Sequence, residues 1–141
     1  MSLTASARSI PGTLRQEVVI GDGHRLVTDE PERLGGEGSA PAPHELLPAA
    51  LASCISTTIV MYARTKSWDV RRVDVDVEYD HKATPRSFEL EVRIEGDLDD
   101  EQLARLERVA ESCPLRRALE TGFEFHERVG RPSLAAVGGP A

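Results

Sequence analysis

Cysteine and aromatic residues are scarce in this chain. Its 141 residues include two cysteines, too few for the disulfide framework that small secreted domains use. Phe, Trp and Tyr together make up 4% of the residues, so the core must be mainly aliphatic. No uninterrupted apolar run reaches about 18 residues, the length that a membrane-spanning helix needs. The sequence therefore predicts an aliphatic core and no membrane span.

Basic residues are outnumbered by acidic ones, 17 to 24, which gives a formal net charge of −7. Nucleic acids and anionic membranes attract proteins with a basic surface, so neither is expected as a partner. Residues 1–11 also lack the basic-then-apolar order of a secretory signal peptide. We therefore expect a cytoplasmic protein.

Histidine and cysteine do not cluster along the chain. None of the four histidines lies within four residues of a cysteine or of another histidine, whereas metal-binding motifs usually have such short spacings. These histidines are His24, His44, His81 and His126. We expect no metal ion and no other cofactor.

The first part of the chain has the pattern of a β-hairpin. Residues 14–20 (LRQEVVI) and 24–28 (HRLVT) are rich in strand-forming residues and flank a turn with the sequence GDG. Residues 1–13 predict a disordered segment or an arm. Residues 29–43 contain glycines and prolines that interrupt helices and strands, and they predict a loop.

The most apolar stretch is residues 45–66, ELLPAALASCISTTIVMYARTK. It has almost no charge before Arg64, and its apolar residues would cover nearly every side of a helix, which is typical of a buried central helix. Pro48 must lie in the first turn, where its missing N–H is not needed. Because one small sheet cannot cover such a helix on all sides, we expect an intimate homodimer.

Two later segments alternate between apolar and charged residues. Residues 70–79 place valines between acids, and residues 88–95 repeat the pattern with Phe88, Leu90 and other apolar residues. Such alternation predicts two half-buried strands, which would pair as an antiparallel hairpin.

The last part of the chain has helix signals followed by a weaker strand signal. Asp99 is a typical helix cap, and the residues after it have helical spacing. Pro114 suits the first position of a further helix that includes residues 115–120. Residues 123–129 alternate weakly and predict a last strand. The order of elements predicts an α+β fold with antiparallel sheets, in a single domain over residues 1–141 with an ordered core of about 14–129 and flexible ends.

The two cysteines lie in different contexts. Cys113 directly precedes Pro114, at a helix start, where free N–H groups and the helix dipole favour a thiolate. Cys54 lies within an apolar helix, where burial alone disfavours a thiolate. A reactive Cys54 would need a cation, and Arg15 and Arg25 on the first hairpin are the candidates. Alternatively, both cysteines are small core residues, because free cysteine is among the most buried residue types.

Three segments together resemble the OsmC/Ohr family. They are DEPERLGG (residues 29–36), APAPHELLPAALASCISTTIVMYARTKSWDV (residues 40–70) and GDLDDEQLARLERVAESCPLRRAL (residues 96–119). The family pattern is a Pro-x-Glu/Gln-Leu-Leu/Phe helix start, a cysteine further along that helix and a later Cys-Pro. The resemblance spans residues 14–128 and is greater to the OsmC-like branch than to the best-studied peroxidases.

The resemblance implies an intertwined homodimer in which antiparallel sheets surround a long buried central helix. It also implies a thiol-dependent peroxidase that reduces organic hydroperoxides in oxidative-stress defence. Cys54 matches the peroxidatic cysteine and Cys113 the resolving one, and an external dithiol would restore the pair without a cofactor.

One position departs from the family's peroxidases. Counting back from Cys54, His44 occupies the place of the glutamate that orients the catalytic arginine, and Glu45 follows one residue later. A shift of one residue turns a helical side chain by about 100°. Glu45 remains a catalytic candidate and His44 a binding candidate, although Glu45 could be an ordinary first-turn acid. For the arginine, Arg15 falls nearest by counting and Arg25 is the second choice.

Two other functions are compatible with the same residues. The dimer interface could hold a small apolar ligand, with the thiols structural or sensory. The chain could also be a redox sensor that acts through a partner protein, with no efficient peroxidase activity.

Overall fold

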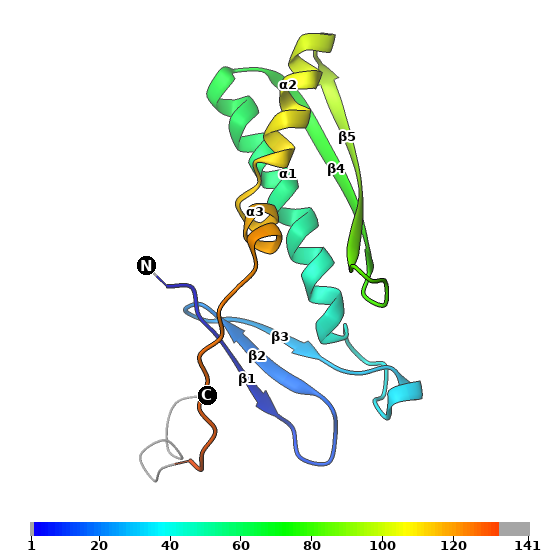
Figure 1. Ribbon diagram of the computed structural model, residues 1–141, viewed down its shortest axis with the longest axis vertical. Coiled ribbons are helices and arrows are strands. Elements are labelled where there is room, and N and C mark those ends of the chain that lie inside the picture. The colour runs from blue at the N-terminus through cyan, green and yellow to red at the C-terminus, as the bar shows by residue number, and fades with distance from the viewer. Residues whose placement is uncertain (1, 133–141) are drawn as a thin grey trace.

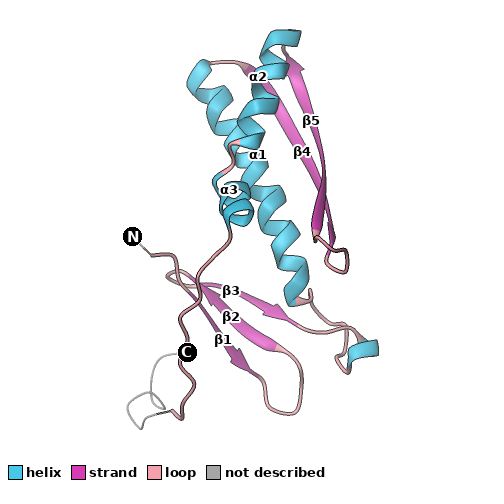
Figure 2. Ribbon diagram, viewed as in Figure 1, coloured by secondary structure: helices cyan, strands magenta, loops and turns pink. Residues whose placement is uncertain are grey.

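The computed structural model describes residues 2–132. Figures 1 and 2 show two separate antiparallel sheets and a long helix with shorter helices beside it. The elements in chain order are β1 (Ala5–Ser9), β2 (Gln16–Ile20), β3 (His24–Thr28), η1 (Glu32–Leu34), η2 (Pro43–Glu45), α1 (Leu46–Lys66), β4 (Asp69–Asp80), β5 (Ser87–Asp97), α2 (Asp100–Glu111) and α3 (Pro114–Thr121). The predicted α+β class with antiparallel sheets is confirmed.

The first sheet contains a strand that the sequence did not predict. β1 pairs along its whole length with β2, from Ala5 opposite Ile20 to Ser9 opposite Gln16. The expectation that residues 1–13 are disordered or an arm was therefore wrong. Every residue of β1 is exposed, so backbone pairing holds this strand rather than side-chain burial. The predicted hairpin of β2 and β3 is confirmed, with β2 beginning at Gln16.

α1 begins and ends at residues with clear local signals. The short helix η2 leads directly into it, and Pro48 lies in its first turn as predicted. The helix ends after Lys66 because Ser67 adopts a left-handed conformation with a φ of 55°.

Within residues 2–132, α1 is covered on one side only. Its buried residues are spaced four apart and form one stripe: Leu51, Ile55, Ile59 and Ala63. Met61, outside this stripe, is 63% exposed. By its length and composition, the segment Pro43–Lys66 could cross a membrane, and core helices of soluble proteins meet the same criterion. Of its most apolar window, 22% is buried. Within a single chain, α1 is therefore buried along one stripe, which agrees with the expectation that one small sheet cannot cover such a helix on all sides.

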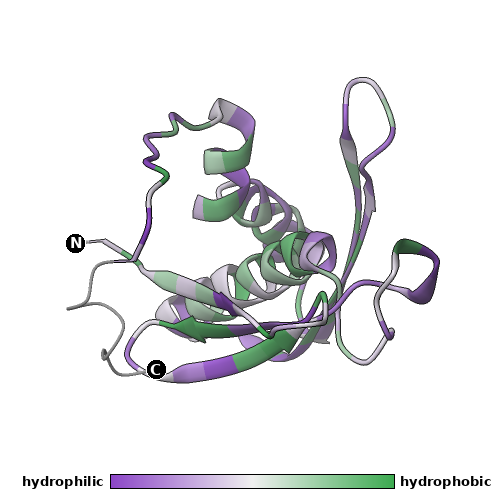
Figure 3. Ribbon diagram, turned by 90° about the horizontal axis from the view of Figure 1, so that it is seen from below, coloured by the Kyte–Doolittle hydropathy of each residue, from purple (hydrophilic) through white to green (hydrophobic). Residues whose placement is uncertain are grey.

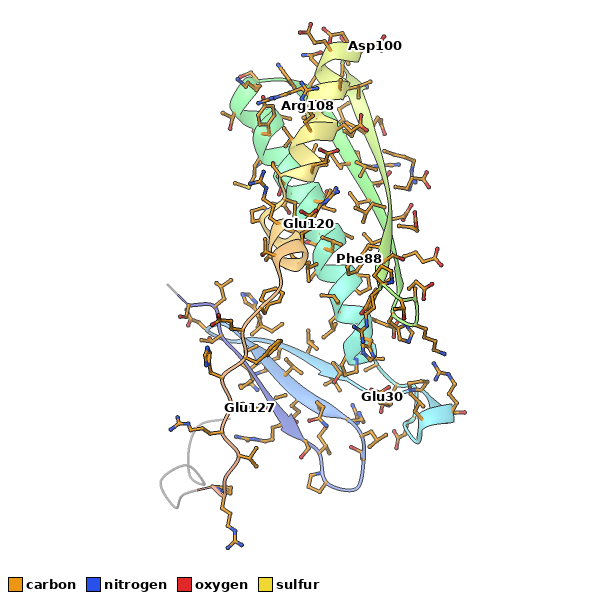
Figure 4. The ribbon with its side chains drawn as sticks, viewed as in Figure 1. Glu30, Phe88, Asp100, Arg108, Glu120 and Glu127 are labelled. Atoms are coloured by element: carbon orange, nitrogen blue, oxygen red, sulfur yellow. The ribbon has the colours of Figure 1, made fainter. Side chains whose placement is uncertain are left out.

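The predicted hairpin of β4 and β5 is confirmed, and it covers the buried stripe of α1. Val75 lies opposite Val92 and Val77 opposite Leu90, so apolar residues share one face. This face packs against the core, and Phe88 points from it toward α1 (Figure 4). Charged residues occupy the other face, where Arg93 forms an ion pair with Asp76.

α2 and α3 start at the predicted caps. Asp99 accepts a hydrogen bond of 2.7 Å from the N–H of Gln102, whose side chain accepts one of 2.9 Å from the N–H of Asp99. Pro114 is the first residue of α3, and Cys113 is its N-cap. α3 ends before Gly122, which has a φ of 80°.

The strand predicted for residues 123–129 is absent. Residues 122–132 form no helix or strand, and Figure 1 shows this stretch running from α3 past the first sheet. Its apolar residues are uncovered, with Phe125 86% and Val129 97% exposed. A strand needs a neighbouring strand to accept its hydrogen bonds, and the described residues of this chain provide none here.

The core lies between α1, α2 and the β4–β5 hairpin. Leu51, Ile55, Ile59, Leu106 and Cys113 form its fully buried centre. Seen from below, the three-stranded sheet and the turn of the β4–β5 hairpin lie on different sides of the helices (Figure 3). The site described next lies at one edge of this core.

Candidate functional site: two thiols between α1 and α3

The structure brings the two cysteines together. Cys54 lies on α1 and Cys113 at the N-cap of α3, and the Cys113 side chain hydrogen-bonds the Cys54 thiol. Cys113 has no exposed surface, whereas Cys54 is half-buried and in contact with the core. Of the two, Cys54 is therefore the thiol that a small molecule reaches more easily.

Opposing influences act on the Cys54 thiol. Burial is the largest and raises its pKa, because a thiolate loses hydration in the core, and the neighbouring Cys113 raises it further. The N–H of Leu115 and the hydroxyl of Thr58 lower it through hydrogen bonds to the sulfur. The net direction is upward, so this single chain favours the protonated thiol. A reactive Cys54 requires a further cation or donor.

The first turn of α3 donates a hydrogen bond to the sulfur of Cys54, whereas the sequence suggested the sulfur of Cys113. Cys113 occupies the predicted N-cap, but its side chain makes no capping hydrogen bond. The free N–H of Leu115, in the first turn of α3, instead donates to Cys54. Spacing along the sequence could not reveal this, because it depends on how α3 packs against α1.

Neither candidate arginine lies beside the thiols in this chain. Arg15 lies in the turn between β1 and β2, and Arg25 lies on β3 opposite Val19. Figure 1 shows the first sheet beyond the N-terminal end of α1, whereas α3 lies beside the middle of that helix. The Nε atom of Arg15 is buried and has no hydrogen-bond partner among the described residues.

Glu45 and His44 lie at the start of α1. Glu45 precedes Cys54 by nine residues, which corresponds to about 14 Å along a helix axis. Its carboxylate accepts a hydrogen bond of 3.0 Å from the N–H of Ala42 and so closes the turn of η2. This contact is typical of a first-turn acid, here in η2, and the catalytic role of Glu45 stays a prediction.

His44 belongs to a row of aromatic rings that the sequence did not indicate. Its ring stacks on that of His81 with centroids 5.4 Å apart, and Tyr79 lies between His81 and Phe88 at 5.9 and 4.8 Å. These rings join the start of α1 to the tip of the β4–β5 hairpin. A cavity of about 710 Å³ lies beside them, with His44, Glu45, His81 and Lys82 in its wall.

Thr58 is a further residue that sequence reasoning missed. Its hydroxyl donates a hydrogen bond of 2.8 Å to the carbonyl of Cys54, four residues earlier on α1. The signal was present, because residues four apart share a helix face. Within residues 2–132, no three His, Cys, Asp or Glu side chains lie close enough together to hold a metal ion.

A thiol pair held between a long helix and the Cys-Pro start of a short one, on antiparallel sheets, defines a small thiol protein of α+β fold. The family described as OsmC-like protein matches residues 36–127, which is most of the chain. The chain therefore belongs to the OsmC-like family, as the motifs predicted. No curated protein matches it significantly.

Solved structures of this family have the same fold. A proposed osmotic stress induced and detoxification response protein from Psychrobacter arcticus 273-4 is 27% identical, with a TM-score of 0.69 over 83% of this chain and 87% of that one. The organic hydroperoxide resistance protein OsmC from Legionella pneumophila is also 27% identical, with a TM-score of 0.58 over 84% and 89%. OhrB of Bacillus subtilis, at 20% identity and a TM-score of 0.53 over 83% and 89%, shares the fold.

Proposed function

We propose that this protein is a thiol-dependent peroxidase that reduces organic hydroperoxides through Cys54 and Cys113. The observation that carries the proposal is the contact between the two thiols, since a sulfenic acid on one can then be resolved by the other. The similarity to the hydroperoxide resistance protein of Legionella pneumophila supports a role in stress defence.

The reaction balances with the two thiols, the peroxide and an external dithiol. The Cys54 thiolate attacks the terminal peroxide oxygen, the O–O bond breaks, and the leaving alkoxide takes a proton to become an alcohol. Cys54 is then a sulfenic acid. The Cys113 thiol attacks the Cys54 sulfur, the S–O bond breaks, and water leaves as the disulfide forms. A cytoplasmic dithiol reduces this disulfide and is itself oxidised.

We further propose that a second copy of the chain covers the open side of α1. Ser53, Thr57 and Met61 are exposed there and carry no charge. The uncovered Phe125 and Val129 belong to a stretch that has no strand partner among residues 2–132 of its own chain. A homodimer would give both features a partner.

The homodimer also bears on how Cys54 is activated. The raised pKa of Cys54 calls for a cation, and the first sheet of a second copy could bring Arg15 or Arg25 to it. The unpartnered Nε of Arg15 makes it the first choice. Arg15→Ala should slow peroxide reduction more than Arg25→Ala does, and Arg8→Ala, on exposed β1, is the control.

The central experiment treats the reduced protein with one equivalent of cumene hydroperoxide. Both thiols should disappear, and mass spectrometry should show one Cys54–Cys113 disulfide within a chain. Cys54→Ser should consume no peroxide. Cys113→Ser should stop at a sulfenic acid that dimedone traps on Cys54. The proposal is lost if both thiols stay free while circular dichroism shows a folded protein.

A second candidate function is the binding of a small apolar ligand. A cavity of about 370 Å³ between α2 and β5 favours it, because Leu90, Val92, Ile94 and Leu103 form much of its wall. Native mass spectrometry of the freshly purified protein would reveal a retained ligand. Such a ligand together with an absence of peroxide turnover would favour this function.

A further inference from the structure

A cavity of about 420 Å³ lies between the C-terminal half of α1 and the neighbouring helix α2. Its wall includes Tyr62 of α1 and Arg105 and Arg108 of α2, and Figure 4 shows Arg108 on α2 beside this part of α1. Among residues 2–132, those that line the cavity include two arginines and no carboxylate, although the chain carries a formal net charge of −7. The cavity is therefore a basic site on an acidic protein.

The arginines of this wall differ from others in the chain. The Nε of Arg105 donates a hydrogen bond of 2.9 Å to the Tyr62 hydroxyl, a neutral partner, and its Cζ lies 5.5 Å from the centroid of the Tyr62 ring. Within residues 2–132, neither Arg105 nor Arg108 forms an ion pair. Several other arginines pair with carboxylates: Arg71, Arg72, Arg93 and Arg116. The positive charge of the cavity wall is thus available to a ligand.

This positive charge acts on the oxygen of Tyr62. The pKa of this phenol is lowered, first by the hydrogen bond from Arg105 and further by the charges of Lys66 and Arg108, against an opposing effect of burial. The surroundings therefore favour a negative charge at this position. Because the Tyr62 oxygen accepts the bond from Arg105, its own O–H hydrogen remains to donate.

An oxyanion is the ligand that these groups match. The guanidinium of Arg105 binds Tyr62 through Nε and keeps its two Nη groups, and such planar donors suit the oxygens of carboxylates and phosphates. Val109 and Met61 add apolar surface that suits the carbon part of a small molecule. Met61 also belongs to the open side of α1, whereas the two arginines lie on α2.

We infer that the cavity between α1 and α2 binds a small molecule that carries a carboxylate or a phosphate group, through Arg105, Arg108 and the Tyr62 hydroxyl. The thiols take no part in this binding, so the inference does not rest on the proposed peroxidase function. Binding is measured without any peroxide, and the failure of one proposal leaves the other in place.

The test uses benzoate and phenyl phosphate, which share an aromatic ring and differ in their oxyanion. Wild-type protein labelled with ¹⁵N is titrated with each probe, and the NMR signals of its amides and arginine side chains are followed. Benzyl alcohol has the same ring without a charge and is the reference. We expect saturable shifts at residues 105–109 with at least one oxyanion and none with benzyl alcohol. The probe that binds more tightly identifies the anionic group that the site prefers.

Variants decide whether the named residues hold the anion. Arg105→Gln and Arg108→Gln should each weaken binding by about tenfold, which is what one hydrogen bond to a charged group contributes. Tyr62→Phe keeps the ring, removes the hydroxyl and should also weaken binding. Arg71→Gln is the matched control, because it removes the same charge from β4, where Arg71 pairs with Asp69.

Arg71→Gln should bind the probe as wild type does. The inference is overturned if neither oxyanion binds or if benzyl alcohol binds as well as they do. It is also overturned if Arg105→Gln and Arg108→Gln bind as tightly as Arg71→Gln while their spectra remain those of a folded protein.

Discussion

Cys113 lies beside Cys54 in the core, where burial raises the pKa of the Cys54 thiol and Cys113 raises it further through a hydrogen bond and its charge. Cys113→Ala removes the hydrogen bond and the charge interaction of the second thiol. The pKa of Cys54 should therefore fall, and more of it should be thiolate at any pH below the midpoint. Peptide-resolved alkylation across pH, in wild type and Cys113→Ala, measures this. An upward move of the Cys54 midpoint would contradict the assignment.

Part of the fold could be predicted from the sequence, and part could not. The helix limits and the β4–β5 hairpin follow from local signals: Asp99 and Pro114 at helix starts, and valines alternating with acids. Strand β1 does not, because its residues are all exposed and it exists through its pairing with β2. The strand expected at residues 123–129 did not form for the converse reason: its alternating pattern was present, but the described part of the chain places no strand beside it.

The candidate site divides in the same way. Family motifs identified Cys54 and Cys113, and the fold places them in contact. The donor from Leu115 could not be predicted, because it depends on the packing of α3 against α1. The places of Arg15 and Arg25 relative to Cys54 depend on where the first sheet lies, which no local pattern encodes.

Asp29 organises the loop before α1 and should make stability depend on pH. It is 1% exposed, and its carboxylate accepts hydrogen bonds of 3.0 and 2.8 Å from the N–H and hydroxyl of Ser39, and others from the N–H groups of Glu30 and Glu37. These bonds hold the pKa of Asp29 below its usual value of 3.8, with those from Ser39 the largest cause.

Because the pKa of Asp29 is lower in the folded state, its carboxylate stabilises the protein at pH values above its usual pKa. That contribution is lost as the pH falls through the lowered pKa. Asp29→Asn should therefore destabilise the protein at pH 7 and lose less stability than wild type on acidification. Urea denaturation at neutral pH and near pH 3 measures both, since the usual value lies between them. Asp22→Asn, in the exposed β2–β3 turn, is the control. Equal acid sensitivity of Asp29→Asn and wild type would contradict the role.

Leu106 and Leu103 lie on the same helix and differ in burial. Leu106 has no exposed surface and belongs to the core with Ile55 and Ile59, whereas Leu103 is 39% exposed. Leu106→Ala should lower the free energy of unfolding by about 2–5 kcal/mol, because it leaves a cavity in packed surroundings. Leu103→Ala should cost less than half as much. Denaturant titration of both variants measures the two losses in the free energy of unfolding. Similar losses would contradict the placement of Leu106 in the core.

The last prediction concerns the exposed side of α1, which we propose a second copy of the chain covers. Thr57 is exposed on this side, opposite the buried stripe to which Ile55 and Ile59 belong. If a second copy covers this side, Thr57→Lys places an unpaired charge in a desolvated interface, which costs several kcal/mol and separates the subunits. Light scattering at micromolar concentration should then show a dimer for wild type and a monomer for Thr57→Lys. Glu101→Lys, at an exposed position on α2, should remain dimeric. A monomeric wild type, or a Thr57→Lys protein that stays dimeric, would show that α1 is covered in another way.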